Sequence, residues 1–129
     1  MKKKTLFVNN SHFNYINTIK EYKSSFGKYS ELMDIEYLDV KNNLRILTEK
    51  LKTEHWDIII FFYDIDFRSL NKVSIDIKNL IRNFFTICIW QDEYHCQKIK
   101  SQIIEDFDIN LTFVNVSEKD AVIIFNNTK

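Results

Sequence analysis

Residues 58–62 constrain the fold more than any other part of the sequence, because they form an uninterrupted apolar run, Ile-Ile-Ile-Phe-Phe. A strand with one face in water alternates apolar and polar residues, whereas a run without alternation is typical of a strand buried on both faces. Such strands occur at the centre of parallel sheets that are covered by helices. The run therefore predicts an interior parallel strand and, with it, an α/β fold.

Strand-like and helix-like segments alternate along the rest of the chain. Short apolar runs between polar residues indicate strands, and apolar residues spaced three or four apart indicate helices. The expected strands are 5–8, 35–40, 56–63, 85–90 and 111–116. The expected helices are 13–22, 44–55, 70–84, 99–107 and 118–126, of which the last also fits a strand. Because such alternation builds right-handed βαβ units, we predict a single domain over 1–129: a three-layer α/β sandwich with a five-stranded, mainly parallel sheet, Rossmann-like or flavodoxin-like.

Charge and composition argue against several classes of function. The 18 basic and 18 acidic residues balance, whereas a general nucleic-acid-binding protein needs a basic surface, so we expect no nucleic-acid partner. The apolar run after the first lysines, 6–8, is too short for a secretory signal, and no run approaches the roughly 20 residues of a membrane span. We therefore expect a cytoplasmic protein. The two cysteines, Cys88 and Cys96, are too few for a disulfide framework, and Cys88 is expected to be a buried small apolar residue.

The chain is poor in the residues that form phosphate-binding loops. It contains one glycine, Gly27, and no proline. Loops that hold dinucleotides or nucleoside triphosphates need glycines, so that backbone amides can approach the phosphates. The turn after the first expected strand, 9–12, reads Asn-Asn-Ser-His and has none. We therefore expect no cofactor, and a flavin-binding electron carrier ranks last among the alternatives.

Polar residues follow each expected strand, and the carboxyl ends of parallel strands meet at one edge of the sheet. Ligands of open α/β sheets bind at this edge, near the point where the strand order reverses. Strand ends are also polar in proteins without a ligand, because they meet solvent, and this explanation stays open for each residue. Asp92 and Glu93 form the most site-like cluster. The three histidines lack metal-ligand spacing, so no metal site is expected. The residues expected to line the cleft are Asn9, Asn10, Ser11, His12, Asp64, Tyr94, His95 and Asn115.

Phosphoacceptor receiver domains share the same order of strands and helices. Their chemistry needs an acidic pair after the first strand and a lysine after the fifth, whereas this chain has Asn9-Asn10 and Asn115. Asp64 stands where the acceptor aspartate would, but the carboxylates that hold magnesium are missing. A degenerate receiver-like regulatory module, without phosphotransfer, is therefore an alternative. It would bind a partner protein or a second copy through its last strand and helix, with Phe113, Val122 and Phe125.

Four segments carry a resemblance to a known family. They are 4–13 (Lys-Thr-Leu-Phe-Val-Asn-Asn-Ser-His-Phe), 57–62 (Asp-Ile-Ile-Ile-Phe-Phe), 86–94 (Thr-Ile-Cys-Ile-Trp-Gln-Asp-Glu-Tyr) and 107–115 (Phe-Asp-Ile-Asn-Leu-Thr-Phe-Val-Asn). Together they resemble the N-terminal Rossmann-like domain of bacterial glycosyltransferases with the GT-B fold, of the spore-maturation-protein type. The third segment is similar to a strand of that family that ends in Trp and leads into an acidic turn with an aromatic residue.

The resemblance implies the acceptor-side half of an enzyme. In that family a second Rossmann-like domain holds most of the nucleotide-sugar donor, and a complete enzyme is more than twice this length. The resemblance places Asp92, Glu93, His12 and Asn10 near the cleft, with Asp92 or Glu93 as the general base that deprotonates the acceptor hydroxyl. The expected ligand is a sugar or nucleotide sugar, and the chain by itself is expected to be inactive.

Overall fold

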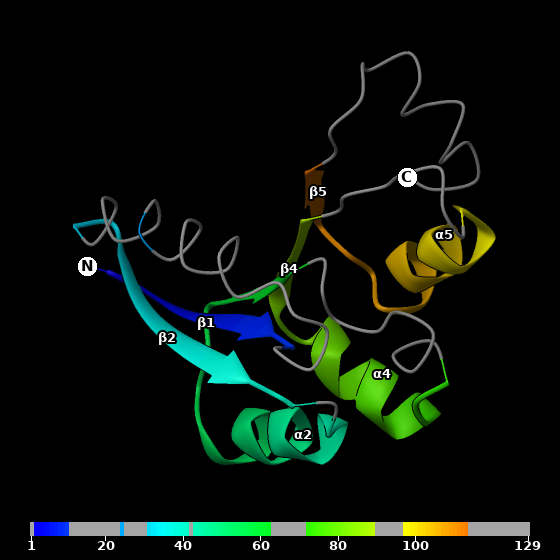
Figure 1. Cartoon of the computed structure of the whole chain (residues 1–129), viewed down its shortest axis with the longest axis horizontal. Helices are drawn as coiled ribbons and strands as arrows, with labels where there is room; N and C mark the ends of the chain where they lie inside the picture. Colours follow the sequence, from blue (N-terminus) through cyan, green and yellow to red (C-terminus); the bar gives the residue numbers. More distant parts are fainter. Residues whose placement is uncertain are drawn as a thin grey trace.

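The structure has the α/β architecture that the sequence predicts (Figure 1). The computed structural model describes residues 2–10, 24, 31–41, 43–62, 72–89 and 97–113. The strands are β1 (Lys3–Asn9), β2 (Met33–Asp39), β3 (Ile58–Phe61), β4 (Phe85–Ile89) and β5 (Leu111–Phe113). The helices are α2 (Leu44–Thr53), α4 (Ile75–Arg82) and α5 (Gln97–Asp106). The helices expected at 13–22 and 118–126 lie outside the described residues.

The five strands form one parallel sheet in the order β2-β1-β3-β4-β5. This is the flavodoxin-like order. β3 pairs with β1 on one side and with β4 on the other, with Ile60 in register with Phe7 and Ile87. The interior position predicted for the apolar run is therefore confirmed. The strand order reverses between β1 and β3, which makes this pair the topological switch point of the sheet.

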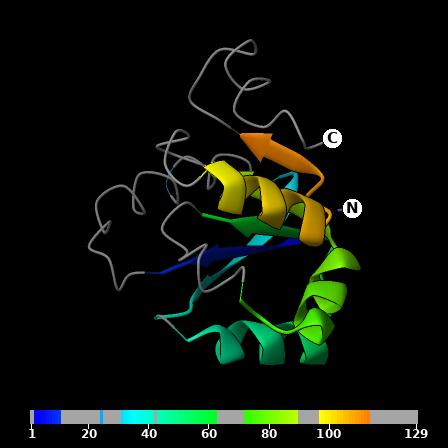
Figure 2. The same cartoon turned by 90° about the vertical axis from the view of Figure 1, so that its right-hand side faces the viewer.

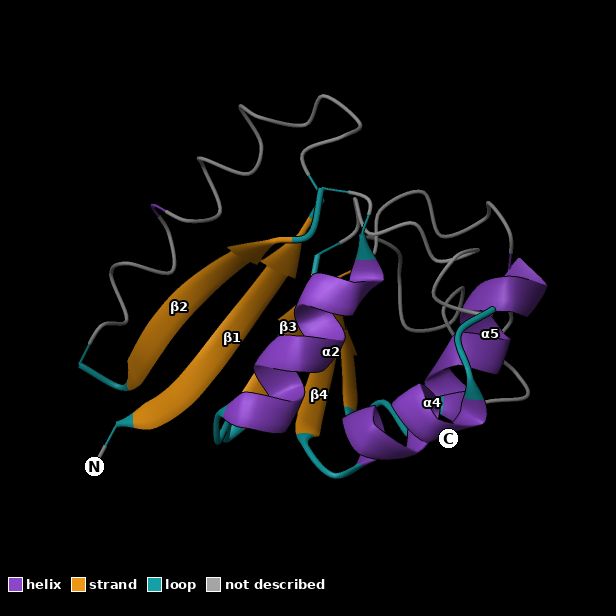
Figure 3. Ribbon diagram, turned by 90° about the horizontal axis from the view of Figure 1, so that it is seen from below, coloured by secondary structure: helices purple, strands orange, loops and turns teal. Residues whose placement is uncertain are grey.

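All three described helices cover the same face of the sheet. Figure 2 and Figure 3 show α2, α4 and α5 on one side of the strands. Leu47 and Leu51 of α2, Ile81 of α4 and Ile103 of α5 pack into one core with strand residues such as Leu6. The connections after β2, β3 and β4 all cross the sheet in the same direction, so right-handed crossovers must place their helices on the same face.

The opposite face of the central strands is buried as well. Phe7, Ile60, Phe62 and Ile89 form a second core cluster. The Phe7 ring lies 5.6 Å from that of Tyr37 and 5.5 Å from that of Phe62, measured between ring centroids. Burial of one large apolar side chain contributes roughly 1.5–3 kcal/mol to folding. Burial of apolar side chains on both faces therefore stabilises the centre of the sheet, as the lack of apolar–polar alternation in 58–62 predicts.

All three described helices differ in their bounds from the sequence-based expectation; α5 covers Gln97–Asp106 rather than 99–107. The helix expected over 70–84 begins at Ile75 and ends at Arg82, and Ser74 caps it: its Oγ accepts a hydrogen bond from the Ile77 amide at 3.4 Å. α2 ends at Thr53, two residues before the expected end. Trp56 was expected in β3 but precedes it, and it is nevertheless buried in the core. The apolar pattern from which these elements are predicted thus extends beyond the ends of the helices and strands themselves.

The scarcity of glycine has a visible consequence in the backbone. Among the residues that the structure describes, two that are not glycine adopt the left-handed conformation, Lys41 (φ 47°) and Asp108 (φ 51°). Asp108 follows α5, where the Ile109 amide donates to the Ile104 carbonyl at 2.9 Å and the Asp108 amide donates to the Glu105 carbonyl at 3.2 Å. These two bonds form a Schellman motif, whose left-handed position is usually occupied by glycine.

Replacing Asp108 with glycine is expected to raise the free energy of unfolding by about 0.5 kcal/mol, because glycine has no Cβ to strain a left-handed backbone. Urea denaturation of the Asp108→Gly variant measures this change. Glu105→Gly, in the last turn of the same helix, is the matched control and is expected to lower the stability by about 0.5–1 kcal/mol. If Asp108→Gly destabilised the protein as much as Glu105→Gly does, the interpretation would be wrong.

Candidate functional site

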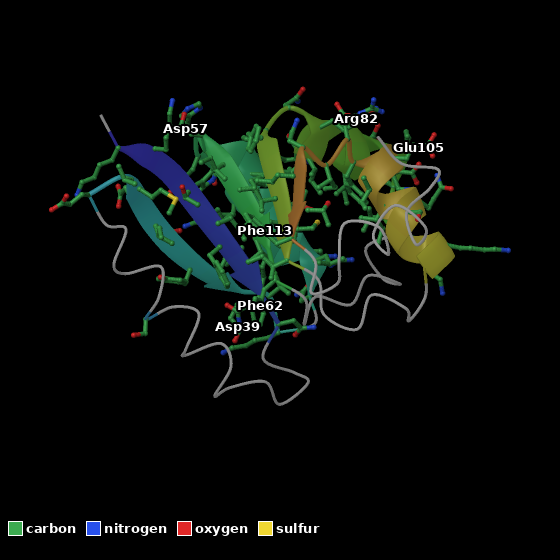
Figure 4. The ribbon with its side chains drawn as sticks, turned by 90° about the horizontal axis from the view of Figure 1, so that it is seen from above. Asp39, Asp57, Phe62, Arg82, Glu105 and Phe113 are labelled. Carbon is green, nitrogen blue, oxygen red and sulfur yellow. The ribbon has the colours of Figure 1, made fainter. Side chains whose placement is uncertain are left out.

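The carboxyl ends of β1, β2 and β3 meet at one edge of the sheet. Figure 4 shows Asp39 and Phe62 together at this edge, with Asp57 at the opposite one. Asn9, the last residue of β1, is in register with Asp39, the last residue of β2. The Val40 amide donates to the Asn9 carbonyl, and the Phe62 amide donates to the Val8 carbonyl, both at 2.9 Å. These bonds extend the sheet one residue beyond β2 and β3 and fix the backbone around Asn9.

Asn9 and Asn10 are buried, although both are polar residues at a strand end. Each is 1% exposed, so contact with solvent does not explain why they are polar. Among the residues that the structure describes, the side-chain oxygen of Asn9 has no hydrogen-bond partner. Asn10, by contrast, has an interaction partner. A buried polar group without a partner costs about 1–3 kcal/mol, so each such group in a native fold requires an explanation, such as backbone strain, an ordered water or a bound ion.

The connection from β2 to α2 is held by its own side chains. Asp39 Oδ1 accepts a hydrogen bond from the Lys41 amide at 3.0 Å, which stabilises the left-handed backbone at Lys41. Asn43 caps α2, since its Oδ1 accepts from the Arg45 amide at 3.1 Å and its own amide donates to the Val40 carbonyl at 2.8 Å. The first turn of α2 therefore has hydrogen-bond partners within the preceding connection, and these bonds fix the backbone that follows β2, the strand next to Asn9.

The described residues include only two of the site residues that the sequence predicts. Asn9 and Asn10 lie at the switch point, as expected. Asp39 and Phe62 also lie there, although the cleft predicted from the sequence omits both. Only the strand order identifies them as part of this edge, because Asn9 lies next to Asp39 only when β1 pairs with β2. The predicted site residues outside the described part of the chain are Ser11, His12, Asp64, Asp92, Glu93, Tyr94, His95 and Asn115.

Charged residues at the opposite edge of the sheet pair with one another. Lys50 forms ion pairs with Glu36 and with Glu54, the latter at 2.7 Å. Hydrogen bonds to Glu36 and Glu54 raise the pKa of Lys50, and the hydrogen bond from Lys50 lowers the pKa of Glu54. The Lys4 ammonium lies 4.6 Å from the centre of the Trp56 ring, within the range of a cation–π contact. These mutual contacts indicate a structural role for this edge.

Other groups in the described residues offer little chemistry. Cys88 is buried, as predicted, and burial raises the pKa of its thiol, which keeps it protonated and unreactive. Within the described ranges, no group of three or more His, Cys, Asp or Glu residues is placed to hold a metal ion. No helix in this part of the chain is both long and apolar enough to cross a membrane.

Comparisons with known proteins found no match to this chain among family models, curated proteins or solved structures. The fold and the site define its class: an α/β protein of flavodoxin-like strand order with buried carboxamides at the switch point.

The fold is expected to lose stability in acid through Asp57. A hydrogen bond from the Lys4 amide (2.8 Å) and a second one from His55 (3.2 Å) lower the pKa of Asp57. A lowered folded-state pKa means that the carboxylate stabilises the fold above its unfolded pKa, about 3.9, and that this stabilisation disappears as the pH falls through the folded-state value.

Asp57→Asn is therefore expected to be less stable than the wild type near neutral pH and to converge toward it in acid. Urea denaturation between about pH 6 and pH 3 measures the difference. Glu31→Gln, which neutralises an exposed carboxyl in the turn before β2, is the control and is expected to follow the wild-type curve. A constant gap between Asp57→Asn and the wild type across this range would contradict the role assigned to the carboxylate.

Proposed function

We propose that the chain is a sugar-binding α/β domain, equivalent to the acceptor-side half of a GT-B glycosyltransferase, and that it is not catalytic on its own. The observation that carries the proposal is the burial of Asn9 and Asn10 at the switch point between β1 and β3. Carboxamides both donate and accept hydrogen bonds, and sugar hydroxyls do the same. The switch point is also where open α/β sheets bind their ligands.

The resemblance of four segments to the GT-B N-terminal domain supports the same proposal. In this proposal the acceptor sugar lies at the carboxyl edge of the sheet, and Asp92 or Glu93 acts as general base toward its hydroxyl. The donor nucleotide sugar is held mainly by a second Rossmann-like domain. Binding without transfer is therefore the behaviour expected of this chain by itself.

The proposal predicts where a sugar perturbs the protein. In NMR titrations with glucose, N-acetylglucosamine and UDP-glucose, the amide signals of Asn9, Asn10, Val40 and Phe62 are expected to shift, because these residues form the carboxyl edge of the central strands. The sugars are expected to be recovered unchanged after incubation with the chain. The amide of Asp57, at the opposite edge, is the internal control. Shifts centred on Asp57, or no shift with any of the three compounds, would contradict the proposal.

A second candidate function is a receiver-like module that binds a second copy of the chain. Phe85, Leu111 and Phe113 are large apolar residues with exposed fractions of 48%, 44% and 54%. The pairing of Ile89 with Phe113 places Phe113 on the same face as Ile89 and, by alternation, Phe85 and Leu111 on that face too. β5 is the last strand in the sheet order, and an apolar edge strand favours pairing with another chain.

This candidate predicts a dimer that Phe113 holds together. Sedimentation velocity over a range of concentrations is expected to show a monomer–dimer equilibrium for the wild type and a monomer for Phe113→Lys, because a charge on the edge strand blocks pairing. Ile75→Lys changes an even more exposed apolar residue at the start of α4 and is expected to leave the dimer intact. A wild-type chain that stays monomeric at every concentration would exclude this function.

A further inference from the structure

We draw no further inference here: the strongest candidate, the exposed apolar patch that Phe85, Leu111 and Phe113 form on β4 and β5, already belongs to the second candidate function, and nothing in the described part of the chain shows what else covers it.

Discussion

The burial of β1 and β3 on both faces is the constraint on which the rest of the structure depends. Leu6 and Val8 point into the core under the helices, whereas Phe7 points into the second cluster. A slip of one residue in β1 would exchange these two sets of side chains, because successive residues in a strand face opposite sides. The same slip would carry Asn9 to the helix-covered face. The register that holds the core therefore also places the candidate site, and the two cannot vary independently.

The polar residues at the two edges of the sheet have different roles. At the amino edge, Lys50, Glu36 and Glu54 neutralise one another within the protein. At the carboxyl edge, the buried groups are neutral carboxamides, and one of their oxygens has no partner in the described residues. Charges that are partly exposed and already paired gain little from a ligand. Open α/β sheets bind their ligands at the switch point, which is why the carboxyl edge is the better candidate for binding.

The sequence predicts the sheet well because its signals are local. The unbroken run at 58–62 and the helical spacing around Leu47 and Leu51 depend on neighbouring residues only, and both appear where expected. The candidate site depends on contacts between distant segments. Nothing near Asn9 in the sequence indicates that it is buried beside Asp39, thirty positions away, since this requires the strand order and the register of β1 with β2. The kinship with GT-B domains stays a prediction, since no comparison bears on it.

The two candidate functions use separate parts of the same sheet. Asn9 lies on β1, whereas Phe113 lies on β5, and β3 and β4 separate them. Neighbouring strands are about 4.8 Å apart, so the two sites are roughly 14 Å apart across the sheet. Substitutions at that separation usually have additive effects on stability. A chain that dimerises through β5 would therefore keep the carboxyl edge of β1 available to a sugar, and the two functions are compatible in one protein.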